Sequence, residues 1–227
     1  NHKSLYGVKN LNITYNLAND LSRVWSRNQT GLANVDLGIT ATVFGTPTLC
    51  LITMTPKLID LINPVQIYPW AQIQSYNTNY GPIASGASNR VTFNAQQLGG
   101  VPRRVYFYAK KQNKDAYDTD TFSRISNVDI RFDGVQGIFA NASTEQLYQV
   151  CAENGYRGSY QDWANYSGSV MCIDFTKDIP MMDYMSVGTN KNINFQISCD
   201  ITNLRPAGVA AITYTFYVMI VYEGIFS

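Results

Sequence analysis

Hydrophobic and polar residues alternate along four stretches of the chain with the two-residue period of a strand that has one buried face. The four stretches are residues 11–17, 35–43, 128–132 and 193–201. Every second side chain in them is apolar, and the side chains between are mostly Asn, Asp, Ser, Thr or Gln. Each stretch is therefore predicted to be a strand that packs on a core with one face and meets water with the other.

Three further stretches, residues 49–54, 105–109 and 212–222, are apolar on both faces. The last of them would be roughly 36 Å long as a strand, at about 3.3 Å per residue. Strands of this kind belong to a sheet that is covered on both sides, or they offer one face to a neighbouring molecule.

Turn sequences that contain Gly, Pro or Asn separate these stretches and divide the chain into about eight or nine predicted strands. The turns lie at residues 45–47, 63–64, 68–69, 80–89, 99–102 and 205–208, and a polar loop is predicted at residues 110–120. The composition agrees with a strand-rich fold. Val, Ile, Thr, Tyr, Phe and Trp total 82 residues, whereas Glu, which favours helix surfaces, occurs only three times.

One helix is predicted within a loop between strands. Ser143 fits its N-cap, with Gln146 three residues later as the partner of a capping box. Residues 154–155 are an Asn-Gly pair that would end the helix. A second, shorter helix is expected to begin at Ser159, with Asp162 three residues later, and to carry Trp163 and Tyr166.

These elements predict an all-β fold, a single eight-stranded antiparallel jelly-roll sandwich with one or two short helices in loop insertions. Residues 1–227 are treated as one jelly-roll domain because no internal repeat, low-complexity tract or linker interrupts them. An immunoglobulin sandwich is the alternative fold. It is disfavoured because the chain lacks the Cys…Trp…Cys spacing of that fold.

The charge balance narrows the possible partners. Lys and Arg number 17 and Asp and Glu 16, so the net charge is +1 and no specific nucleic-acid partner is expected. Asn, Gln, Ser and Thr total 66 residues, which predicts a polar but largely uncharged surface that can pack closely against other copies. No run of 18 apolar residues occurs, so no membrane span is expected.

Catalytic chemistry is poorly supported by the sequence. The only histidine is His2, which removes most zinc or iron sites and any Ser–His–Asp machinery, and argues against an enzyme of the cupin kind. The four cysteines, Cys50, Cys151, Cys172 and Cys199, are not spaced as metal ligands, and we expect them to be reduced, buried thiols rather than disulfides. We therefore predict no enzyme activity and assign no catalytic, cofactor-binding or metal-ligating residue.

Several charged residues have a structural interpretation that outweighs a functional one. Arg103 and Arg104 are expected to form salt bridges or subunit contacts rather than a nucleic-acid patch, because adjacent strand residues point to opposite faces. Glu223, within an apolar strand, is expected to pair with an Arg or to protect a sheet edge. Glu145 and Glu153 lie about 12 Å apart along one predicted helix, which is too far for a retaining glycosidase pair.

Two further sets of residues were candidates for ligand binding. The Asp-rich loop with Asp115, Asp118 and Asp120 lacks the Gly and Glu of a calcium-binding loop, so a solvated loop is favoured. The three tryptophans are expected at core margins or subunit interfaces rather than stacked on sugars. They are Trp25, Trp70 and Trp163.

Four segments together resemble the double-jelly-roll major capsid proteins of virophages, polinton-like viruses and related large DNA viruses. They are Val-Pro-Arg-Arg-Val-Tyr-Phe-Tyr-Ala-Lys at 101–110, Ile-Arg-Phe-Asp-Gly-Val-Gln-Gly at 130–137, the helical insertion at 142–156, and the closing strand at 217–226. Proteins of that family contain two fused jelly rolls, so the resemblance implies that this chain is the carboxyl-terminal one. It also implies trimeric capsomers that tile an icosahedral shell with other capsid proteins, in a virion assembled inside the host cell, without a cofactor.

Two functions therefore compete. The first is a self-assembling capsid protein, supported by the resemblance and by the uncharged polar surface. The second is a carbohydrate-binding jelly-roll domain, such as a lectin or a spike head, which would cluster exposed aromatic residues and Asn or Asp at one loop end.

Overall fold

The computed structural model describes residues 10–14, 48–53, 68–112, 122–166, 168–205 and 210–226. The chain divides into two compact units, residues 1–32 with 114–119, and residues 33–113 with 120–227. Every helix and strand of the described residues lies in the second unit. The described part of the first unit, residues 10–14, is exposed and has no regular secondary structure.

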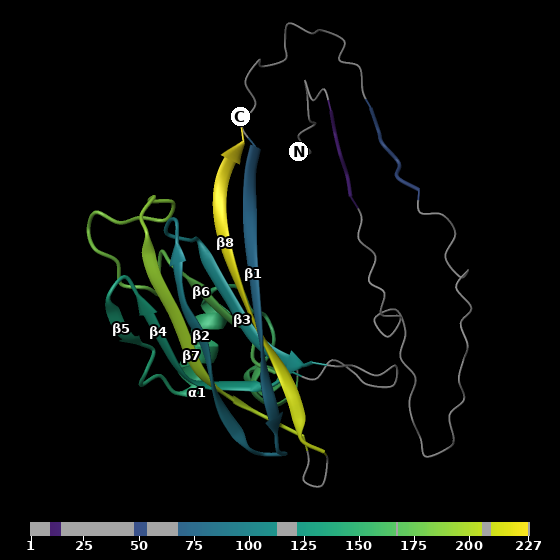
Figure 1. The fold of residues 1–227 in the computed structure, drawn as a ribbon, viewed down its shortest axis with the longest axis vertical. Helices are drawn as coiled ribbons and strands as arrows, with labels where there is room; N and C mark the ends of the chain where they lie inside the picture. Colours follow the sequence, from purple (N-terminus) through teal and green to yellow (C-terminus); the bar gives the residue numbers. More distant parts are fainter. Residues whose placement is uncertain are drawn as a thin grey trace, which may run out of the picture. The chain divides into compact units, whose positions relative to one another are not determined.

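Two antiparallel sheets of four strands each form the second unit (Figure 1). The first sheet has the order β1 (Tyr68–Ile83), β8 (Ile212–Phe226), β3 (Arg104–Lys111) and β6 (Met171–Asp174). The second sheet has the order β2 (Ser88–Leu98), β7 (Ile193–Thr202), β4 (Arg124–Phe132) and β5 (Val135–Ile138). Consecutive strands mostly alternate between the sheets, which is the arrangement of a jelly-roll sandwich and confirms the predicted fold class.

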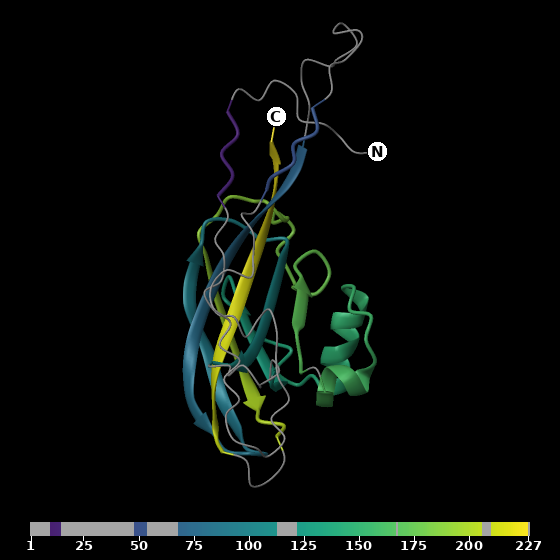
Figure 2. The same cartoon turned by 90° about the vertical axis from the view of Figure 1, so that its right-hand side faces the viewer.

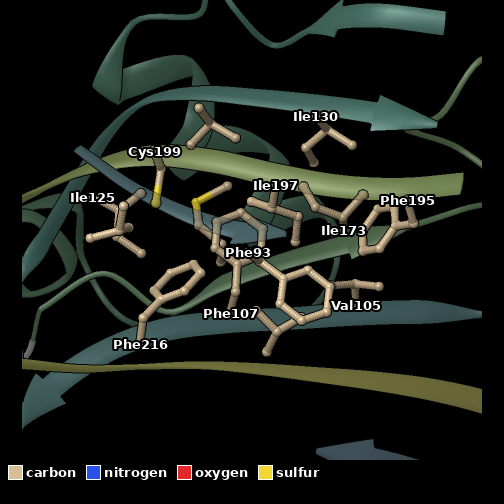
Figure 3. Packing of buried hydrophobic residues seen from close by; sticks show 14 of the residues in the cluster. Phe93, Val105, Phe107, Ile125, Ile130, Ile173, Phe195, Ile197, Cys199 and Phe216 are labelled. Carbon is tan, nitrogen blue, oxygen red and sulfur yellow. The ribbon is translucent and has the colours of Figure 1, made fainter. Parts of the chain in front are cut away.

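The core fills the space between the two sheets (Figure 3). The run at residues 105–109 turns Val105, Phe107 and Ala109 inward, where each is 0% exposed. Figure 3 shows side chains of the second sheet, among them Ile125 and Ile197, on the side of the core opposite Val105 and Phe107. This two-residue alternation is the physical reason that the strands adopt their register, because a slip by one residue would expose the whole inward set.

The helical insertion forms as predicted. Helix α1 (Thr144–Glu153) begins after Ser143, whose side chain accepts a hydrogen bond from the Gln146 amide, and the Gln146 side chain accepts from the Ser143 amide in return. Asn154 is the C-cap, and Gly155 follows with a φ of +108° that suits glycine. A π-helical turn, η3 (Asp162–Tyr166), follows and contacts β4 and α1, while helix α1 itself lies beside β6 (Figure 2).

Strand β1 is not among the strands that the sequence predicts. Residues 68–69, predicted as a turn, begin β1, and residues 80–83 at the start of the predicted 80–89 loop end it. From Ala71 to Asn79 most side chains of β1 are exposed, so no alternation of apolar and polar residues marks it. Residues 68–83 form a strand because they pair with β8, which is apolar.

Two of the three strands predicted in the first 54 residues do not form where the structure describes them. The described residues 10–14 and 48–53 are exposed and form no strand. The predicted strand at residues 35–43 lies outside the described residues.

Candidate assembly surfaces

The outer face of the first sheet, which points away from the second sheet, carries aromatic and apolar side chains. In the register of the sheet, Tyr108 lies opposite Tyr217, and Tyr106 lies opposite Met219. The rings of Tyr108 and Tyr217 stack with centroids 5.2 Å apart and planes 17° apart. The Lys110 ammonium lies 5.2 Å from the centroid of the Tyr217 ring, a cation–π contact.

The apolar stripe continues onto β1. Ile73 lies opposite Val221 in the register and is 61% exposed. Strands β3 and β8 are therefore apolar on both faces, as the runs at residues 105–109 and 212–222 predicted. The inner face is buried in the core and the outer face is half-buried.

The ends of β1 and β8 continue past their neighbours as a two-stranded ribbon. Strand β3 pairs with β8 only between Tyr214 and Val221, whereas β1 pairs with β8 as far as Phe226. Figure 1 shows this ribbon projecting beyond the end of β3. Trp70, 47% exposed, lies on the ribbon opposite Gly224.

An ion cluster lies where the ribbon leaves the sandwich. The Asp174 side chain, 0% exposed, is 3.1 Å from Arg104 Nε and 3.6 Å from Arg103 Nη2. Arg103 Nε is also 3.9 Å from the Glu223 carboxylate. The expected salt bridges are thus confirmed, but the expectation that the two arginines diverge was wrong. Arg103 precedes β3, so the alternation of a strand does not apply to it.

The Asp174 carboxyl group of this cluster is held in its ionised form. Burial is the largest influence on the pKa of Asp174 and would raise it. Hydrogen bonds from the Thr176 side chain and amide, the hydrogen bond from Arg104 and the charge of Arg103 outweigh burial and lower the pKa below its ordinary value. Asp174 is therefore a carboxylate at neutral pH and anchors β6 to β3.

A hydrogen-bond network ties the helical insertion to the same strand. The Asp178 carboxylate accepts from the Asp174 amide at 2.8 Å and from Asn154 Nδ2 at 2.5 Å. Asn154 Nδ2 also donates to the Cys172 carbonyl at 3.0 Å. The residue that caps helix α1 thus fixes the helix against the edge of the first sheet.

The aromatic residues of the insertion are mostly engaged with one another. Trp163 is 0% exposed, packs edge-on against Tyr148 with ring centroids 6.0 Å apart, and donates from Nε1 to the Val170 carbonyl at 3.2 Å. Tyr166, by contrast, is 80% exposed. Of the three tryptophans, Trp163 is buried and Trp70 lies on the ribbon, while Trp25 lies outside the described residues.

Three of the four cysteines are buried, and the fourth, Cys50, is exposed. Cys151, Cys172 and Cys199 are buried free thiols, as predicted, and burial raises the pKa of each, that of Cys151 to about 12. Cys50 is exposed, so its predicted burial was wrong, since the strand predicted around it does not form.

Ligand-binding features are sparse in the part of the chain that the structure describes. That part holds no group of three or more His, Cys, Asp or Glu residues able to bind a metal ion. His2 and the Asp-rich loop at residues 113–120 lie outside it. A hollow of about 210 Å³ is lined by Lys111, Gln112, Arg205 and residues 210–213, which is less than the usual volume of a small-molecule site. None of the described helices is long and apolar enough to cross a bilayer.

The two-sheet topology, the helical insertion and the aromatic outer face define a structural jelly-roll protein of the kind that builds viral shells. Residues 72–170 and 164–224 match the family model of the major capsid protein V20 C-terminal domain. The chain belongs to this family of capsid proteins, as the resemblance of its sequence segments had implied.

Individual relatives agree with this assignment. The chain is 26% identical over 250 residues to the putative capsid protein V20 of Sputnik virophage, covering 96% of the chain and 42% of the relative. A capsid chain in the cryo-EM structure of the Sputnik virophage superposes with a TM-score of 0.67 at 25% identity, over 75% of this chain and 38% of that one.

The mavirus major capsid protein shares the fold. Its crystal structure superposes with a TM-score of 0.66 at 18% identity, over 76% of this chain and 41% of the mavirus chain. The chain thus spans about two-fifths of the length of the relatives that it matches.

Proposed function

We propose that the chain is the carboxyl-terminal jelly roll of a viral major capsid protein and acts as a structural unit of the virion shell. The observation that carries the proposal is the agreement of fold and sequence over the same residues. The family model covers residues 72–224, the region that holds almost all of both sheets. Residues 1–227 would then form one jelly-roll domain of a longer, double-jelly-roll chain.

The proposed mechanism is association rather than catalysis. Three capsid chains would meet around a threefold axis as a capsomer, and the capsomers would tile an icosahedral shell with other capsid proteins inside the host cell. A stable contact of this kind buries well over ~1,000 Å². The half-buried aromatic outer face of the first sheet, with Tyr108 and Tyr217, supplies suitable apolar surface. Many such contacts act together, so each can be weak.

Charge and chemistry support a structural role without a cofactor. With a net charge of +1, the chain has no overall field to hold nucleic acid. The buried thiols are poor nucleophiles because their raised pKa values keep them protonated at neutral pH.

Carbohydrate binding is the second candidate. Two exposed aromatic residues favour it, Tyr166 at 80% and Tyr184 at 70% exposure, because exposed rings can stack on sugars. The buried position of Trp163 weighs against it, since the largest aromatic side chain of the insertion cannot reach a ligand.

Mass photometry and negative-stain electron microscopy of the purified chain test the proposal. Trimers or larger closed particles are expected, and a glycan array is expected to give no signal. A stable monomer that binds glycans would contradict the capsid role and support the alternative.

A further inference from the structure

Four strands form the edges of the two sheets, and three of them carry features that discourage pairing with another chain. Strand β6 is only four residues long, and Asn154 from the helical insertion donates to its Cys172 carbonyl. Strand β5 is also four residues long, contains Gly137 at a φ of +77°, and pairs with an irregular register.

Strand β2 is protected by a charge and a bulge. Arg90 lies 3.1 Å from Asp200 on the neighbouring strand and also donates to the Asn127 carbonyl. The register shifts between Phe93 and Gln96, which bends the strand.

Strand β1 has none of these protections along most of its length. It keeps one register with β8 from Tyr68 to Tyr80, and its 16 residues include no Asp, Glu, Lys, Arg or His. Within the described residues β8 is the only strand paired with it. The other edge of β1 therefore presents a row of backbone donors and acceptors, interrupted only at Pro69 and Pro82.

We propose that this edge of β1 pairs antiparallel with β1 of a second copy of the chain, joining two first sheets across a twofold axis. This inference rests on the proposed function, because a shell of identical subunits brings copies of the same edge together. When two copies pair through the same edge of β1, that edge is occupied in both chains. The contact therefore ends at a dimer and does not extend into a fibre.

The composition of β1 suits a copy of itself better than a different strand. Residues directly opposite one another in an antiparallel pair repel when they carry like charges, and β1 carries none. Its middle, Gln-Ser-Tyr-Asn-Thr-Asn at residues 74–79, is polar and can form hydrogen bonds with its own sequence. A partner that binds through charged side chains would have no opposite charge to pair with on β1.

The geometry of a pleated sheet places the axis. In an antiparallel pair, directly opposite residues point to the same face of the sheet. The twofold axis must therefore lie where a residue is opposite its own copy, and not between two successive residues of the strand. The centre of the segment between Pro69 and Pro82 lies at Ser75 and Tyr76. Tyr76 packs inward against Phe93, with ring centroids 5.3 Å apart, whereas Ser75 is exposed on the outer face. An axis at Ser75 places Ile73 opposite the partner's Asn77 on the outer face of the joined sheets.

Substitution of the axial residue tests the pairing. Ser75→Lys would set two ammonium groups directly opposite each other, so at least a tenfold loss of affinity between copies is expected in analytical ultracentrifugation. Asn94→Lys, an exposed position on β2, adds the same charge to another edge and is expected to leave association unchanged. Circular dichroism of each variant monitors the fold.

Disulfide trapping locates the axis independently. In a Cys50→Ser background, Ser75→Cys is expected to give a covalent dimer on oxidation. Asn77→Cys is expected to give none, because its two copies would lie about 13 Å apart, beyond the reach of a disulfide. A dimer trapped at position 77 and not at 75 would overturn the axis, and no dimer at either position would overturn the pairing.

The two proposals can fail separately. Trimers or shells that form equally well with Ser75→Lys would leave the capsid role intact and overturn β1 pairing. A chain that forms only β1-paired dimers, trapped through position 75, would support the pairing and contradict the threefold capsomer.

Discussion

The indole of Trp70 lies across the backbone of Gly224, its direct partner on the neighbouring strand, so closely that a β-carbon at Gly224 would collide with the ring. Aromatic side chains that cover a cross-strand glycine compensate for the packing that glycine lacks. The contact lies on the two-stranded part of β1 and β8, where β3 no longer supports the sheet. It stabilises a ribbon that would be only marginally stable by itself.

Removal of this indole should loosen the ribbon locally. Trp70→Ala is expected to cost roughly 0.5–1 kcal/mol of unfolding free energy, the range of a cross-strand pair. Hydrogen exchange should quicken at residues 222–224 and stay unchanged at β7. Tyr166→Ala, an exposed aromatic residue on the insertion, is the control and should change neither quantity.

The core between the sheets should show the largest losses of stability. Phe107 is 0% exposed and packs edge-on against Phe216, with ring centroids 6.1 Å apart. Phe107→Ala is expected to cost about 3–5 kcal/mol in urea unfolding, through lost burial and the cavity left behind. Ile73→Ala, on the 61% exposed outer face, should change the stability of dilute monomer by less than about 0.5 kcal/mol. Similar losses for both variants would contradict the assignment of inner and outer faces.

The capping box of helix α1 is a separate, smaller contribution. Ser143→Ala removes the acceptor for the Gln146 amide and should cost about 1 kcal/mol of unfolding free energy. Gln149→Ala, an exposed position on the same helix, is the matched control and should have little effect. Thermal unfolding followed by circular dichroism measures both, and equal effects would show that the cap is unimportant.

Acid should weaken the ion cluster around Asp174. The pKa of Asp174 is lower in the folded chain than its ordinary value, so its stabilising contribution is complete above about pH 4 and is lost as the pH falls through the lowered value. Urea unfolding of the wild-type chain should therefore lose stability below pH 4 more steeply than Asp174→Asn. Asp183→Asn, at an exposed loop position, should follow the wild-type curve. Parallel curves for wild type and Asp174→Asn would contradict the pKa direction.

The strands that bury a regular apolar face could be predicted from the sequence, and β1 could not. Along β7, every second residue from Ile193 to Ile201 is buried, and the pattern of the sequence repeats that burial. The uncharged side chains of residues 71–79 give no such signal, although the absence of charge over so long a segment could have indicated a pairing edge. The unsupported predictions at residues 10–14 and 48–53 show the converse, because alternation without a neighbouring strand does not make a sheet.

The features of the candidate assembly surfaces were likewise only partly predictable from the sequence. The apolar character of both faces of β3 and β8 was predicted from the sequence. The pairing of Glu223 with an arginine was one of two expected outcomes, and the structure identifies that arginine as Arg103. The convergence of Arg103 and Arg104 on Asp174 was not foreseen, since the residues are 70 or more positions apart and only the pairing of β3 with β6 brings them together.

The sequence by itself determined the class of fold, the buried face of the regular strands, the capped helix and the capsid family, because each depends on local periodicity or on residues close in the chain. The tertiary structure decided which strands lie at the edges, which charges meet, and which face stays open. Those properties depend on contacts between segments that are distant in sequence.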